Sequence, residues 1–222
     1  MDFWLARGAI LVIAGLQIAV VNNLSVGPRW LAPIIELALL APLSVATAWT
    51  QHKARRAADD EQWVAVERIF RHVRWLAITL TALATVMNFG QLARLVQAML
   101  AGHAGTAQTL LLDAVNIWLT NVVIFALWFW TIDRNGPTGV GTDQECNGDF
   151  VFTQQQMRGA RFRGWTPGFV DYLFLAFTNA TAFSPADTFP ISRRAKLLMM
   201  AESATSLITI AVVASRAVGI LS

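Results

Sequence analysis

The sequence contains few charged residues, one cysteine and three histidines. These low numbers limit the classes of protein to which it can belong. Charged residues make up 14% of the 222 residues, whereas a soluble domain carries about 25%. One cysteine excludes an internal disulfide framework, and three scattered histidines form no metal-binding pattern with it. We therefore expect neither a water-soluble enzyme nor a bound metal or cofactor.

The sequence contains several long apolar segments. Hydrophobic residues make up 55% of the chain, and the mean hydropathy is +0.50. A helix needs about 20 apolar residues to cross a bilayer core of about 30 Å. The segments near this length are residues 3–21, 30–49, 75–99, 109–132 and 197–221. The pattern predicts an all-α, polytopic integral membrane protein with about five transmembrane helices, surrounded by membrane lipids.

Two polar segments divide the chain into regions. Residues 51–74 are rich in charge, and their apolar positions recur at helical spacing, which predicts an amphipathic surface helix or an extension of the next span. Residues 133–166 begin with several glycines and a proline, which predicts a polar loop. The expected organisation is a four-span region at 1–132, this loop, and a distinct unit at 167–222.

The distinct unit begins with an apolar run that is too short to span comfortably. Residues 169–183 number 15, and an irregular stretch with Pro185 and Asp187 follows them. A re-entrant helix and loop, which enters and leaves on one side of the membrane, is the favoured interpretation. A sixth full span at 169–189 is the alternative.

Several residues of this unit resemble the pore module of the tetrameric potassium-channel superfamily. They are Asp171, Tyr172, Phe174, Phe177, Thr178, Thr181, Asp187, Pro190, Glu202, Ala214, Arg216 and Gly219. In that module a short aromatic pore helix ends in threonines, a filter follows, and an Asp-x-x-Pro step leads to an inner helix. The resemblance implies a homo-oligomer, with a tetramer favoured, that passes small inorganic ions.

A second resemblance covers most of the chain. The same stretch, together with residues 118–121 and 22–30, is similar to a family of bacterial multi-pass membrane proteins. This resemblance implies a location in the bacterial cytoplasmic, or inner, membrane. It brings no activity with it.

The chain departs from the potassium-channel pattern at the filter itself. A potassium filter reads Thr-Val-Gly-Tyr-Gly, and its glycines let consecutive carbonyls point at the ion. The residues here are Ala182, Phe183, Ser184, Pro185 and Ala186. Without glycine, and with φ fixed at Pro185, that carbonyl ladder cannot form. The segment predicts a wider pore lined by Thr181, Ser184 and Asp187, or a channel fold that does not conduct.

Polar groups gather where the short helix meets this loop. Thr178, Asn179, Thr181 and Ser184 suit the wall of a lined cavity, although the same groups would also serve to cap the loop. By resemblance to the pore module, Glu202 would bond to the short helix or the loop and support the filter from behind. Ser206 falls where such channels have the hinge of the gate.

Charged residues inside apolar spans need a partner or a cavity. An unpaired charge costs at least about 2.5–3.5 kcal/mol on insertion scales. Arg94 and Asp113 lie near the same uncharged turn, which predicts a buried ion pair between adjacent spans. Asn88, Asn116 and Asn121 are expected to bond across helices.

The distribution of basic residues indicates the orientation. An N-terminus inside the cell places the basic residues of segments 53–74 and 134–163 in the cytoplasm, as the positive-inside rule requires. The basic cluster at 193–196 would join them there among lipid phosphates, with attraction of permeating anions as the alternative. Potassium-channel geometry would reverse this orientation, and we favour the charge pattern.

The leading hypothesis is therefore an oligomeric, ion-channel-like membrane protein. No catalytic triad, paired catalytic carboxylates, phosphate loop or cofactor motif is present in the sequence, so an enzyme is not predicted. Nucleic acid is not an expected partner, because the basic residues cluster at the ends of spans. The alternatives are a non-conducting structural or partner-binding subunit, or a small-solute carrier that uses the region of Arg94 and Asp113.

Overall fold

The fold is known from a computed structural model that describes most of the chain from residue 60 onward. The described residues are 8, 11, 15, 34, 38, 60–101, 107–133, 148–157, 159, 165–182, 184 and 187–221. The first two predicted spans, 3–21 and 30–49, lie outside the described residues apart from those isolated positions.

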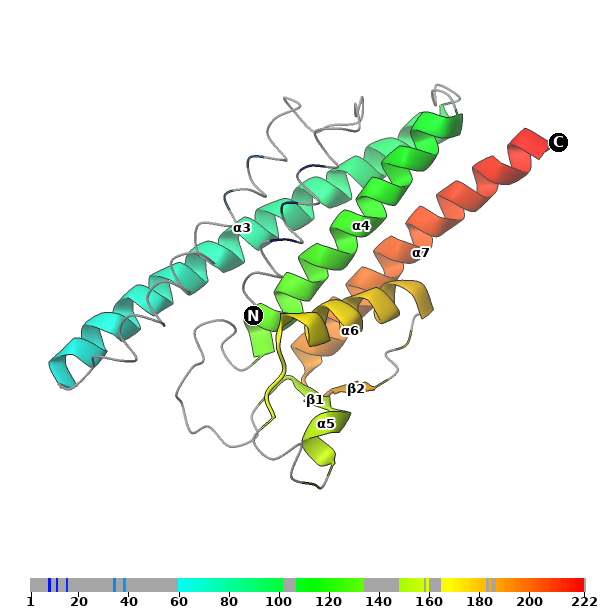
Figure 1. The fold of residues 1–222 in the computed structure, drawn as a ribbon. Helices are drawn as coiled ribbons and strands as arrows, with labels where there is room; N and C mark the ends of the chain where they lie inside the picture. Colours follow the sequence, from blue (N-terminus) through cyan, green and yellow to red (C-terminus); the bar gives the residue numbers. More distant parts are fainter. Residues whose placement is uncertain are drawn as a thin grey trace.

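Three long helices run side by side in Figure 1: α3 (Asp60–Leu100), α4 (Ala107–Ile132) and α7 (Arg193–Leu221). Each contains a stretch that is long and apolar enough to cross a membrane, namely Trp75–Leu100, Gln108–Ile132 and Arg193–Ser215. Three of the five predicted spans are therefore confirmed as such helices. The chain is consistent with an integral membrane protein.

The interior of these helices contains polar side chains beside apolar ones, and many large apolar side chains lie outside. Buried polar residues come from all three: Thr81, Asn88, Gln91, Asp113, Asn116, Thr120, Asn121, Glu202, Thr205, Ser206 and Thr209. Large apolar side chains such as Val86, Leu111 and Leu207 are exposed. A helix in a soluble protein usually exposes polar side chains, so the exposed apolar side chains here suit an apolar surrounding.

Helices α3 and α4 form an antiparallel hairpin. The indole Nε1–H of Trp128 donates to Thr85 Oγ1 at 2.9 Å and fixes their register. Nearer the turn, Leu95 of α3 shares an apolar cluster with Ala114 and Ile117 of α4. Helix α3 is continuous from Asp60 through its span, so its polar beginning extends the span.

Helix α6 (Phe169–Ala182) is short and crosses α4 and α7 near one end of the bundle (Figure 1). Its first residue, Phe169, packs against Trp130 with ring centroids 5.3 Å apart, close to where α4 ends. The ring of Phe177 packs edge to face against that of Trp118 of α4, with ring centroids 5.8 Å apart. Helix α6 therefore runs back along α4 from the end of that helix.

A two-stranded antiparallel sheet lies beyond α6. Strand β1 (Phe150–Phe152) pairs with β2 (Thr188–Pro190), with Phe150 opposite Pro190, and the short helix α5 (Thr153–Gln156) follows β1. The sequence predicted only a loop at 133–166, and an all-α chain, so this sheet is a difference. Its aromatic rings explain it, because Phe150 and Phe152 both pack against Tyr172 of α6.

Candidate functional site

The candidate site is the junction where α6 meets the two spans beside it. Asn179, near the end of α6, donates through Nδ2 to Glu202 Oε2 at 2.7 Å and to the carbonyl of Met199 at 3.0 Å. Ser203 Oγ donates back to the carbonyl of Asn179 at 3.3 Å. The C-terminal part of α6 is therefore fixed to α7 by three hydrogen bonds.

Helix α4 joins the same junction through Asn121. Its Nδ2 donates to the carbonyl oxygen of Glu202 at 3.3 Å and to Ser206 Oγ at 3.1 Å. The side chains of Glu202 and Ser206 are completely buried. Two amide side chains from two different helices thus converge on one turn of α7.

The junction lies inward from the end of the bundle at which α7 begins. Glu202 follows the start of α7 at Arg193 by nine residues, which corresponds to about 14 Å of helix. The chain beyond α6 returns to β2, directly before α7, and Ile191 N donates to the carbonyl of Asp149 at 2.8 Å. Helix α6 therefore begins at one end of the bundle, extends inward, and is followed by a return to that end.

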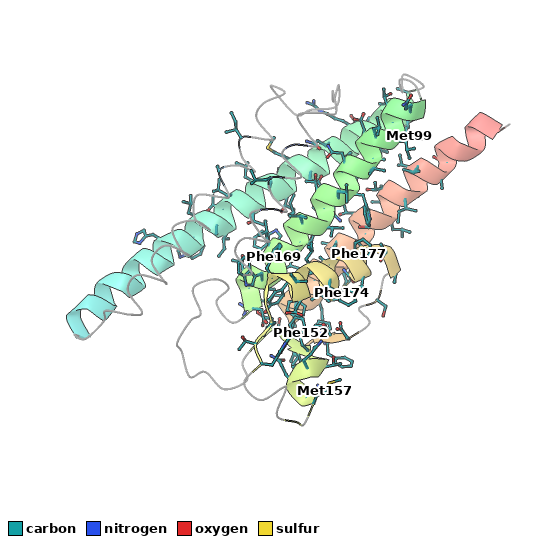
Figure 2. The ribbon with its side chains drawn as sticks, viewed as in Figure 1. Met99, Phe152, Met157, Phe169, Phe174 and Phe177 are labelled. Atoms are coloured by element: carbon teal, nitrogen blue, oxygen red, sulfur yellow. The ribbon has the colours of Figure 1, made fainter. Side chains whose placement is uncertain are left out.

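The structure describes only some of the residues predicted to form the filter. Thr178 and Thr181 direct their hydroxyls to their own helix, onto the carbonyls of Phe174 and Phe177 at 2.9 Å and 2.8 Å. Ala182, the last residue of α6, is exposed. Phe174 and Phe177 of α6, labelled in Figure 2, are each about half exposed.

The remaining filter positions follow α6. Ser184 is exposed and Asp187 is half-buried. The carbonyl of Asp187 accepts from Thr153 N at 3.1 Å, and its Oδ1 accepts from Thr188 Oγ1 at 3.2 Å. Phe183, Pro185 and Ala186 lie outside the described residues.

The two residues of the predicted ion pair, Arg94 and Asp113, differ in burial. The side chain of Arg94 is exposed, whereas Asp113 is buried in α4. Their ion pair stays a prediction. Among the predicted bridging asparagines, Asn121 bonds across helices, while the buried amides of Asn88 and Asn116 have no partner.

A second polar cluster, which sequence reasoning missed, ties the end of the bundle together. We call Asp133, Asp149, Tyr172 and Arg194 the aspartate clasp. Asp133 is buried and accepts from Tyr172 OH at 2.6 Å and from the backbone N–H of Asp149 at 2.5 Å. Asp149 in turn forms an ion pair with Arg194 at 2.6 Å. The clasp joins the end of α4, the approach to β1, α6 and the start of α7.

The aspartate clasp has no local sequence signal. Its partners are 16 to 45 residues apart along the chain, so only the fold brings them together. The one hint is that Asp133 comes directly after an apolar span, where an acidic side chain needs either water or a partner.

No family model, curated protein or solved structure matches the chain. Within the described ranges, no group of three or more His, Cys, Asp or Glu side chains is placed to hold a metal ion. The chemistry that the junction offers is a buried carboxylate, two amides, and the C-terminal end of a short helix.

Proposed function

We propose that the protein is a homo-oligomer, a tetramer by resemblance, that passes small ions in the bacterial cytoplasmic membrane. The re-entrant element would be α6 together with residues 183–187. The observation that carries the proposal is the bond between Asn179 and Glu202, because it places the C-terminal part of a 14-residue helix about 14 Å along a neighbouring span.

The order of elements also supports the proposal. Along the chain, α4, α6 and α7 come in the order span, short helix, span, with β1 and α5 before α6 and β2 before α7. Outer helix, pore helix and inner helix come in the same order in the resembling pore module. In this arrangement Glu202 holds the short helix from behind. The loop after Ala182 would then line a passage.

The electrostatics of the short helix favour cations over anions. The C-terminus of a helix carries a partial negative charge of about half an elementary charge, and α6 directs this end inward. Asp187 adds a carboxylate within five residues of that end. Arg194, a basic residue of the same region, is already paired with Asp149.

The outer face of α6 supports assembly into an oligomer. Val170, Phe174 and Phe177 are about half exposed and follow one stripe of the helix. A single copy of a loop cannot enclose an axial pore, so neighbouring copies must complete the wall. Packing of this stripe against a second copy would bury it.

The test is ion flux through the purified full-length chain in reconstituted vesicles. We expect K⁺ or Na⁺ flux, and Asp187→Asn should change conductance or ion preference without changing assembly, because it removes a charge at nearly constant shape. Glu61→Gln, a matched change in the polar beginning of α3, should leave both unaltered.

Two outcomes would reject the proposal. A monomer of native mass in detergent would remove the axial pore. Absence of flux from a folded wild-type oligomer would favour a non-conducting structural or partner-binding subunit. Unchanged flux in a folded Asp187→Asn variant would count against the loop as the pore wall.

A further inference from the structure

The sheet formed by β1 and β2 has one buried face and one apolar face that is exposed. Phe150, Phe152 and Thr188 lie on the buried face, and each is at most 3% exposed. Side chains alternate between the two faces of a strand, so Val151 and Phe189, which lie opposite each other, share the other face. Phe189 is 59% exposed.

The alternation continues one residue beyond β2. Ile191 N donates to the carbonyl of Asp149 at 2.8 Å, which extends the pairing of the strands, and Ile191 is 56% exposed. We call Val151, Phe189 and Ile191 the outer sheet face. An antiparallel sheet with one face in water usually carries polar side chains on that face. The apolar outer sheet face therefore indicates a surrounding other than water.

Aromatic contacts fix the depth of the sheet relative to the spans. Phe150 packs against Phe129, in the last turn of α4, with ring centroids 5.2 Å apart. Trp130 follows in the same turn, and Trp165 packs against Phe152 with centroids 5.8 Å apart. Tryptophan side chains gather where the bilayer meets water. The sheet therefore lies at the depth of the lipid headgroups.

Two exposed basic residues follow the outer sheet face in the sequence. Arg193 and Lys196 lie in the first turn of α7, two and five residues after Ile191. Within the described ranges neither forms an ion pair, whereas Arg194 between them is held by Asp149. Lys and Arg side chains near a bilayer surface attract anionic headgroups. Apolar side chains followed directly by unpaired cations suit the boundary between acyl chains and phosphates.

We propose that the outer sheet face is an anchor in the membrane interface. Phe189 and Ile191 insert among the headgroups of anionic phospholipids in the leaflet where α7 begins, with Arg193 and Lys196 at the level of the phosphates. A two-fold contact between two copies through this face would bring like charges together, so the partner is the lipid surface. The anchor holds β2 and the start of α7 at a fixed depth, and it does not rest on the passage of ions.

The test measures the surroundings of a spin label by electron paramagnetic resonance. Cys146, the only cysteine of the sequence, is first replaced in the full-length chain by Cys146→Ser. A nitroxide on Phe189→Cys then reports on the outer sheet face in vesicles of phosphatidylethanolamine and phosphatidylglycerol. Oxygen concentrates in lipid and a neutral nickel chelate stays in water, so the ratio of their collision rates with the label distinguishes the two surroundings.

Two other exposed positions provide the references. Val86→Cys, in the apolar stretch of α3, is the lipid reference, since Val86 is 67% exposed. Met157→Cys is the water reference. Met157 is 52% exposed directly after α5, and Figure 2 shows it at the end of the molecule away from the long helices.

We expect the ratio of oxygen to nickel collisions at Phe189→Cys to shift clearly from the value of Met157→Cys toward that of Val86→Cys. Ile191→Cys should shift in the same direction, which keeps the test independent of one position. A ratio equal to that of Met157→Cys would place the face in water. Low collision rates with both reagents would show that protein covers it. Either result in a folded chain would overturn the proposal, whether or not the vesicles conduct ions.

Discussion

At the scale of single residues, the junction depends on amides that donate hydrogen bonds to Glu202. Asn179 bonds its carboxylate and Asn121 bonds its backbone carbonyl. One such hydrogen bond contributes about 1 kcal/mol net, whereas a buried donor left without a partner costs about 1–3 kcal/mol. The effect of a substitution on the stability of the junction is therefore set mainly by the cost of the buried group that it leaves without a partner.

Glu202→Ala should destabilise the protein by about 1–3 kcal/mol, because it leaves the Nδ2 group of Asn179 without its carboxylate acceptor. Glu202→Gln keeps an oxygen at that place and should cost less. Thermal unfolding in detergent measures both. Wild-type stability of Glu202→Ala would show that the carboxylate contributes nothing to the junction.

Tyr172→Phe tests the aspartate clasp by removing one oxygen atom. The lost bond ends on the carboxylate of Asp133, and bonds to charged groups are worth about 1.5–3 kcal/mol. Asp133 keeps its backbone donors from Asp149 and Phe150, so the loss should fall at the lower end. Tyr172→Leu also removes ring contacts and should cost more, and a smaller loss than Tyr172→Phe would contradict the packing.

At the scale of elements, the sequence was informative about long helices and uninformative about short strands. Hydropathy over about 20 residues predicts a span without tertiary information, and the predicted spans 75–99 and 109–132 agree with the observed ones to one residue at their ends. Strands β1 and β2 have three residues each. Their pairing depends on a partner about 40 residues away.

The residues of the site were also only partly identifiable from the sequence. Glu202 and the polar end of α6 were identifiable because charged and amide side chains are conspicuous in apolar segments. The hydrogen bond between Tyr172 and Asp133 was not identifiable, because the two residues are 39 positions apart in the sequence. The basic cluster at 193–196 was predicted to lie among lipid phosphates, and the pairing of Arg194 with Asp149 could not be foreseen from the sequence.

The ion pair between Arg194 and Asp149 joins an exposed side chain to a buried one. The side chain of Arg194 is 63% exposed, but that of Asp149 is 4% exposed, so loss of the guanidinium leaves a buried carboxylate without its charged partner. A buried group that loses its partner costs about 1–3 kcal/mol. Arg194→Gln should therefore lower the stability measured by thermal unfolding by about 1–3 kcal/mol. A cost near zero would show that the ion pair does not stabilise the clasp.

At the scale of the whole molecule, the helix ends that adjoin the basic stretches of the sequence lie toward one end of the bundle. The polar beginning of α3, the end of α4, the sheet and the start of α7 lie toward this end, while α3 ends and α4 begins at the other (Figure 1). Residues 101–106, between α3 and α4 in the sequence, contain no Lys or Arg. The asymmetry in charge between the two ends is thus a property of the arrangement of these three helices.

This asymmetry predicts the orientation in the membrane. The positive-inside rule applies best to short loops, so the basic end should face the cytoplasm and Cys146, in the segment between α4 and β1, should face it too. In intact cells Cys146 should resist a membrane-impermeant maleimide and react after permeabilisation. Tyr172→Phe, which leaves the charges unchanged, should label in the same way. Labelling of the wild type from outside would contradict the charge argument and support the orientation of potassium channels, because fold resemblance alone does not fix direction.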